Sequence, residues 1–191
     1  MNSVVFHGRD CWHRDWGGVT LAGRGDPRRL DGELTAFFAS RQCPGQAIRA
    51  ALKWALHQAQ AGCAVVGGFH SPLERSVLEL LLEARSPVVA VLARSVESAR
   101  LPVAWQAAIG RGHLVVVSGT SDRRRLDHDR SSSRNELVAT LASEIVVAHI
   151  NPVGSLAAQV REWRRRGNTV VVLHGDCMFN GMPGRAAVST E

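Results

Sequence analysis

The segment CAVVGGFHSPLERSVLELLLEARSPVVAVL, residues 63–92, is the clearest indication of the fold class. Its first apolar run, residues 63–66, predicts a buried strand that ends in the glycine-containing turn GGFHS. Residues 72–83 are predicted to form a helix that begins at a proline, because apolar side chains return there at helical spacing. After a second proline, residues 88–92 predict another buried strand. Strand, helix and strand in this order are typical of a parallel crossover unit.

The same alternation continues on both sides of this unit. Further buried strands are predicted at residues 34–40, 114–118, 145–148 and 169–173. Further helices are predicted at residues 46–60, 101–109, 134–142 and 155–166. The polar run 119–133 is interpreted as a loop. Consecutive Val, Ile and Leu in strands separated by helices predict an α/β protein with a Rossmann-like, doubly wound, mainly parallel sheet and helices on both faces.

The two ends of the chain fit this pattern less well. Residues 1–33 contain two tryptophans and several glycines, and short strands are expected only at 4–6 and 19–21. We expect residues 1–33 to form an N-terminal extension packed on the sheet edge, and residues 34–174 to form the Rossmann-like domain. The glycine-containing residues 175–191 are expected to be an irregular C-terminal tail.

Length and composition exclude several classes of protein. With 191 residues, 45% hydrophobic and 21% charged, the chain is expected to form one compact domain rather than a disordered or collagen-like protein. It has no apolar run long enough for a membrane helix and no secretory signal at its start, so a cytoplasmic protein without membrane contact is expected. Its four cysteines form no CxxC pair, which favours free thiols over a metal site.

The charge is strongly basic and arginine-rich. The 23 basic residues exceed the 17 acidic ones, the formal net charge is +6, and Lys53 is the only lysine. Arginine can bind phosphate through two parallel hydrogen bonds and can stack on bases. The excess is partly local, in clusters at residues 123–134 and 161–166, although a GC-rich genome also favours arginine codons. The clusters indicate an anionic partner, with nucleic acid or a nucleotide first.

Four predicted loops carry the candidate binding residues. Ligands of open parallel sheets bind beyond the carboxyl ends of the strands, and free amides at helix N-termini favour an anion there. Alternatively, the small residues of these loops only form turns, and Ser71 and Ser155 only cap helices. The candidate phosphate-binding or ligand-binding residues are Ser40, Arg41, Gly45, Gly67, Gly68, Phe69, His70, Ser71, Glu74, Ser118, Arg134, Asn135, Gly154 and Ser155.

No residue is assigned a catalytic role, and no cofactor is expected. His70 could contact a base or donate a proton, or it could be a turn residue with its hydrogen bonds satisfied. Glu74 could be a general base, or it could suit the first turn of a helix, where the dipole favours a carboxylate. The chain lacks GxGxxG after a strand, GxxxxGK[ST] and GxSxG, which removes the motif support for a dinucleotide cofactor, a P-loop and an α/β-hydrolase.

Three segments resemble a known family. SRQCPG at 40–45, VVGGFHSPLER at 65–75 and RNELVATLASEIVVAHINPVGSL at 134–156 look like the Rossmann-like domain of DNA-processing protein A, also called DprA or Smf, within the SLOG superfamily. The resemblance covers roughly residues 34–173. It implies that Arg134, Asn135, Gly154 and Ser155 match pocket motifs, and that Gly67 and Gly68 occupy the place of a glycine-rich loop. That loop departs from the family's GxARGID-type sequence.

The resemblance implies a protein that binds single-stranded DNA, or a nucleotide, without catalysis, in DNA processing or recombination. It also implies a recombination protein, RecA, as a partner. A homodimer through a sheet edge or through residues 161–166 is compatible with the sequence. The alternatives are a nucleotide-sensing regulator and an enzyme acting on a nucleotide, with Glu74 or His70 as acid–base groups. The turn PVGSLAAQ lacks the PGGxGTxxE motif of the related phosphoribohydrolases, which counts against their reaction.

Overall fold

The computed structural model describes residues 4–7, 11–119 and 128–173. Its strands form one sheet with the spatial order β1-β2-β3-β7-β6-β5-β4-β8-β9. The strands are β1 (Val4–His7), β2 (Cys11–Trp16), β3 (Val19–Arg24), β4 (Leu34–Phe38), β5 (Ala64–Gly67), β6 (Val88–Val91), β7 (Leu114–Ser118), β8 (Glu144–Val147) and β9 (Val170–Val172).

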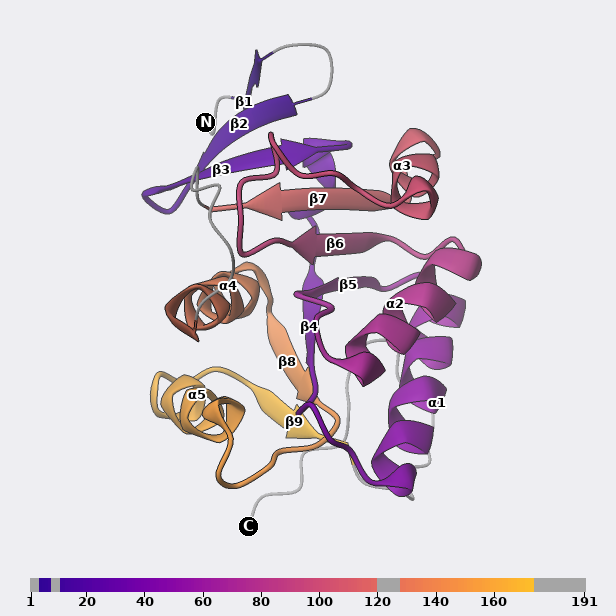
Figure 1. The fold of residues 1–191 in the computed structure, drawn as a ribbon, viewed down its shortest axis with the longest axis vertical. Helices are drawn as coiled ribbons and strands as arrows, with labels where there is room; N and C mark the ends of the chain where they lie inside the picture. Colours follow the sequence, from indigo (N-terminus) through magenta and orange to yellow (C-terminus); the bar gives the residue numbers. More distant parts are fainter. Residues whose placement is uncertain (1–3, 8–10, 120–127, 174–191) are drawn as a thin grey trace.

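Helices cover both faces of the sheet (Figure 1). Helices α1, α2 and α3 lie on one face, and α4 and α5 lie on the other. The helices are the 3-10 helix η1 (Pro27–Leu30) and the α-helices α1 (Gly45–Ala61), α2 (Pro72–Glu83), α3 (Val103–Gly110), α4 (His128–Leu141) and α5 (Ser155–Arg165). The α/β, doubly wound, Rossmann-like fold predicted from the sequence is confirmed.

The order of the parallel strands places a switch point at β4. From β4 the chain runs through β5, β6 and β7 in one direction, and then crosses to the other side of β4 to form β8 and β9. All pairs from β7 across to β9 are parallel, whereas β1, β2 and β3 pair antiparallel and join the sheet at β7. The loops that follow β4 and β8 therefore diverge to opposite faces, and such a divergence opens a crevice at the carboxyl ends of the strands.

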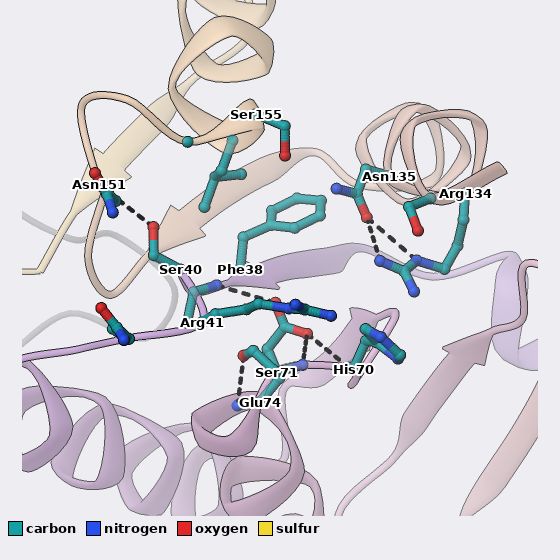
Figure 2. A pocket seen from close by; sticks show the side chains of 15 residues that line it. Phe38, Ser40, Arg41, His70, Ser71, Glu74, Arg134, Asn135, Asn151 and Ser155 are labelled. Carbon is teal, nitrogen blue, oxygen red and sulfur yellow. Dashed lines mark hydrogen bonds between the residues drawn. The ribbon is translucent and has the colours of Figure 1, made fainter. Parts of the chain in front are cut away.

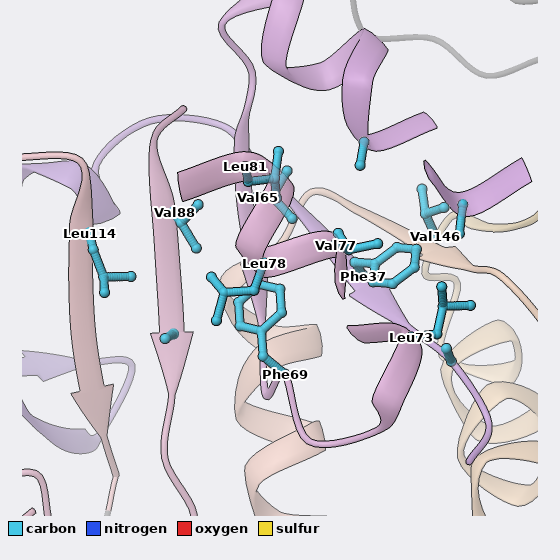
Figure 3. Close-up of a cluster of buried hydrophobic side chains, with 14 of the residues drawn as sticks. Phe37, Val65, Phe69, Leu73, Val77, Leu78, Leu81, Val88, Leu114 and Val146 are labelled. Atoms are coloured by element: carbon cyan, nitrogen blue, oxygen red, sulfur yellow. The ribbon is translucent and has the colours of Figure 1, made fainter. Parts of the chain in front are cut away.

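Two buried clusters hold the helices onto the sheet. Phe37 and Phe38 are successive residues of β4, so their side chains point to opposite faces. Phe37 stacks on Trp54 of α1, with the ring centroids 4.9 Å apart, and Phe38 packs against Trp163 of α5 at 4.8 Å. Figure 3 shows the cluster on the side of Phe37, to which α2 contributes Leu73, Val77, Leu78 and Leu81. The strand β4 thus anchors both layers directly below the crevice.

Helix α4 begins earlier than the sequence predicts. Residues 128–133, interpreted as part of a loop, belong to this helix, and residues 120–127 lie outside the described residues. Consecutive serines have modest helix propensity, which is why the pattern indicated a loop. Packing against α5 supplies the missing stabilisation, since the side-chain amide of Gln159 donates to the carbonyl of Ser132 at 3.4 Å.

Strand β2 was not predicted, because its sequence CWHRDW is largely polar. Trp12 and Arg14 alternate toward the buried side of this strand, and both are less than a tenth exposed. The guanidinium of Arg14 forms an ion pair with Asp31. With β2 in place, strands β1, β2 and β3 form a three-stranded antiparallel continuation of the sheet.

The expected C-terminal tail, residues 175–191, lies outside the described residues, as does residue 174. Among the residues that are described, no helix is both long enough and apolar enough to cross a membrane.

Candidate functional site

A pocket of about 680 Å³ lies at the carboxyl ends of β4, β5 and β8, at the switch point (Figure 2). Its volume is within the range of small-molecule and nucleotide sites. Three loops and the side of α4 form its walls. The lining residues are Phe38, Ala39, Ser40, Arg41, Gln42, His70, Ser71, Glu74, Ser131, Arg134, Asn135, Asn151, Gly154, Ser155 and Leu156.

Ser40 joins two of these loops. Its hydroxyl accepts a hydrogen bond from the amide of Asn151 at 2.8 Å, and its own amide donates to the carbonyl of His149 at 3.1 Å. The thiol of Cys43 donates to the carbonyl of Ser40 at 3.2 Å. Burial, followed by the negative charge of Glu74, raises the pKa of the Cys43 thiol, so this sulfur stays protonated at neutral pH. These contacts fix the loops after β4 and β8 at the pocket mouth.

Glu74 holds the loop after β5 in place. It is 6% exposed, and one carboxylate oxygen accepts from the amide of Ala39 at 3.0 Å. The other oxygen accepts from the amides of His70 at 2.7 Å and Ser71 at 3.0 Å. Ser71 caps α2 by accepting from the amide of Glu74, which completes a capping box. Because both oxygens already accept backbone donors, the carboxylate positions the loop.

Arg134 of α4 reaches across the pocket to the loop after β5. A Cβ on Gly68 would lie only 2.5 Å from its Nε, so the missing side chain of Gly68 leaves room for the guanidinium. Nε and one terminal nitrogen of Arg134 donate to the side-chain oxygen of Asn135 at 3.2 and 2.8 Å. The side-chain nitrogen of Asn135 donates in turn to Gln159 of α5 at 2.8 Å. Asn135 therefore holds the guanidinium of Arg134 in a fixed orientation.

Arg41 and His70 lie at the same end of the pocket as Arg134. Figure 2 shows these three side chains converging from the loop after β4, the loop after β5 and helix α4. In the described part of the chain, no carboxylate lies within 4.0 Å of either guanidinium. Burial lowers the pKa of Arg134, although a guanidinium remains charged in proteins. The pocket thus has two cations without an ionic partner among the described residues.

The N-terminus of α5 completes the pocket on the side of β8. Gly154 is the N-cap, and no side chain caps this helix end. Ser155 is exposed, and Figure 2 places its hydroxyl toward the pocket. Helix N-termini carry free amides and a partial positive charge, so this end reinforces the positive potential of the arginines.

The structure brings nine of the fourteen candidate residues into the pocket lining and places five outside it. The five outside are Gly45, Gly67, Gly68, Phe69 and Ser118. Gly68 still shapes the pocket through Arg134, whereas Phe69 is a core residue whose ring packs over Gly67. Gly45 is the exposed first residue of α1. Ser118 is fully buried, and its hydroxyl accepts from the amide of Val96 at 3.1 Å.

Several lining residues were not among the candidates. Gln42 and Asn151 lie in the segments SRQCPG and RNELVATLASEIVVAHINPVGSL, so a polar side chain in a loop that follows a strand was an available signal. Ser131 was hidden by the interpretation of residues 119–133 as a loop. Phe38, Ala39 and Leu156 contribute apolar surface, and nothing in the sequence distinguishes them from ordinary core residues.

No metal centre is found among the described residues, which contain no group of three or more His, Cys, Asp or Glu side chains able to hold an ion. Cys11, Cys43 and Cys63 are free thiols there. The described lining residues supply arginine, histidine, hydroxyl and amide groups, and one carboxylate, Glu74, whose two oxygens already accept backbone amides. Such a set can bind an anion and hold it in place.

Comparison with known proteins connects this geometry to one family. A family model described as DNA recombination-mediator protein A matches residues 17–187. No curated protein matches the chain.

Solved structures share the fold at low sequence identity. DNA processing protein A from Helicobacter pylori, described as having a unique single-stranded DNA binding mode, is 16% identical with a TM-score of 0.66, over 80% of this chain and 71% of that one. DNA processing protein A from Streptococcus pneumoniae is 17% identical with a TM-score of 0.68, over 84% of this chain but only 56% of the other. The present chain therefore spans little more than half of the Streptococcus protein.

Proposed function

Because the chain belongs to the DNA recombination-mediator protein A family, we propose that it binds single-stranded DNA, without catalysis, through the pocket at the switch point. The observation that carries the proposal is the convergence of Arg41 and Arg134 in this pocket, where no described carboxylate lies within ion-pair distance of them. Cations held without an ionic partner are suited to bind an external anion.

The shape of the pocket favours a single strand over a duplex. A phosphate that reaches Arg134 has to enter between three loops and α4. A flexible single strand can bend into this space, whereas bending a duplex requires substantial free energy. The exposed hydroxyl of Ser155 and the N-terminus of α5 provide further donors for a second phosphate or a sugar.

The structure offers weak support for the enzymatic alternative. Both oxygens of Glu74 accept backbone amides, and the thiol of Cys43 is kept protonated, so neither group is poised as a general base or nucleophile. Release of free base from nucleoside monophosphates by the protein would contradict the non-catalytic part of the proposal. Competition by a nucleoside monophosphate without turnover would indicate a nucleotide ligand instead of a strand.

The proposal is tested by fluorescence anisotropy with a labelled oligothymidylate. Counterion release on a single strand gives a slope of about −0.7 per phosphate contact in log affinity against log salt. Two arginine contacts therefore predict a slope of about −1.4, and Arg134→Ala should reduce it by about 0.7. We expect Arg134→Ala to weaken binding about tenfold or more, since a hydrogen bond to a charged group contributes about 1.5–3 kcal/mol.

The matched control is Arg111→Ala, which removes the same charge from an exposed position after α3, remote from the pocket lining. Equal losses in the two variants would show that binding depends on net charge alone, and no binding by the wild type at low salt would remove the proposal. Two further expectations have their own tests. Light scattering tests whether the protein is a homodimer, and mixing with a purified recombinase tests whether it has a recombination protein as a partner.

A further inference from the structure

The loop after β5 is built to hold His70 at the pocket. Phe69, the residue before it, has a φ of 47°, a conformation that is unfavourable for a residue with a large side chain. Two features hold Phe69 there. Its ring is 4% exposed in the core, and the amides of the next two residues donate to Glu74. A strained backbone held from two sides fixes the position of His70, whose side chain faces the pocket in Figure 2.

The neighbours of His70 are mainly cationic. The charges that act on it are those of Arg134 from α4, Arg75 and Glu74 from α2, and Arg41 from the loop after β4. Burial first, and then the charges of Arg134 and Arg75, lower the pKa of His70, while Glu74 alone acts in the opposite direction. In the free protein the imidazole is therefore neutral at physiological pH.

We propose that His70 is a proton-linked contact for the bound phosphate, so that binding of a DNA strand is coupled to the uptake of a proton by its imidazole. This inference rests on the proposed function, because the anion concerned is the phosphodiester bound beside Arg134. A negative charge there offsets the repulsion from the arginines and favours the imidazolium, whose two N–H groups are both donors. The bound complex then takes up a proton that the free protein does not carry.

The sign of the pH dependence follows from this linkage. Because the pKa of His70 is higher in the complex than in the free protein, affinity rises as pH falls through the range between the two values. Each unit of difference between the two pKa values changes the affinity tenfold. We expect binding to be about three- to tenfold tighter near pH 6 than near pH 8, at constant ionic strength.

The experiment measures the dissociation constant of an oligothymidylate without a terminal phosphate. Thymine and the phosphodiester group do not titrate in this range, so proton uptake belongs to the protein. Wild type, His70→Gln and His70→Arg are compared by anisotropy at about pH 6 and about pH 8. Calorimetry in buffers of different ionisation enthalpy then counts the protons taken up.

The two variants have opposite expected results. His70→Gln should bind at pH 6 as weakly as the wild type does near pH 8, with no remaining pH dependence. His70→Arg supplies a permanent cation, so it should bind tightly at both pH values. The control His113→Gln changes a half-buried histidine next to β7, outside the pocket lining, and should keep the wild-type pH dependence.

Two outcomes would overturn the inference, and they are distinguishable. A wild type that binds equally well at both pH values, or a His70→Gln variant that keeps the full pH dependence, would show that His70 is not the linked group while DNA binding stands. Failure of the wild type to bind at any pH would remove the proposed function as well.

Discussion

A substitution of the single residue Gly68 is expected to affect ligand binding while leaving the stability of the fold almost unchanged. Its φ is not in the left-handed region, so Ala is compatible with the backbone there, and the atoms that a Cβ would meet belong to the flexible end of Arg134. Gly68→Ala should therefore change the free energy of unfolding by no more than about 0.5 kcal/mol. It should nevertheless weaken oligonucleotide binding about three- to tenfold, because the guanidinium has to move.

The matched control is Gly45→Ala, where a Cβ would approach no atom closer than 3.7 Å. Denaturant titrations and anisotropy on the same preparations measure both quantities. If Gly68→Ala binds like the wild type, the position of the Arg134 guanidinium over this glycine is unimportant for the ligand.

At the scale of elements, Glu74 ties the start of α2 to the end of β4. We expect Glu74→Ala to lower the free energy of unfolding by about 2–4 kcal/mol, because three backbone amides lose a charged acceptor and two of the three are at buried residues. The control Glu79→Ala, an exposed carboxylate of the same helix, should change it by less than about 0.5 kcal/mol. Unfolding in urea measures the free energy of unfolding of both variants. An unchanged stability in Glu74→Ala would contradict the structural role of Glu74 and would favour an acid–base role.

The same element shows which features the sequence could reveal. Ser71, a proline and Glu74 form a local helix-start signal, and the periodic leucines of α2 follow it directly, so α2 and its strands could be predicted. The approach of Arg134 to Gly68 could not be predicted from the sequence. It depends on how α4 packs on one face of the sheet relative to the loop that leads from β5 into α2 on the other face. Residues 128–133 were misjudged for the same reason, because contact with α5 outweighs their weak local propensity.

At the scale of the whole molecule, the N-terminal strands and the parallel sheet share one hydrophobic core. Trp12 of β2 is 1% exposed and belongs to the same buried cluster as Phe38 and Trp163, which lie below the pocket. Its ring covers Gly23, and its indole N–H donates to the carbonyl of Gly25 at 2.7 Å. Strand β2 is thus packed onto the parallel sheet through a side chain that reaches the buried interior.

The Trp12→Ala variant tests whether strands β1 to β3 unfold together with the parallel sheet or independently of it. Removing a buried tryptophan from a shared core is expected to lower the free energy of unfolding of the whole chain by about 3–5 kcal/mol. Far-ultraviolet circular dichroism and tryptophan fluorescence should then report a single, coincident transition at a lower urea concentration. Two separate transitions, with the second at the wild-type midpoint, would mean that strands β1 to β3 unfold independently of the parallel sheet. The pocket would then keep its affinity when these strands are unfolded.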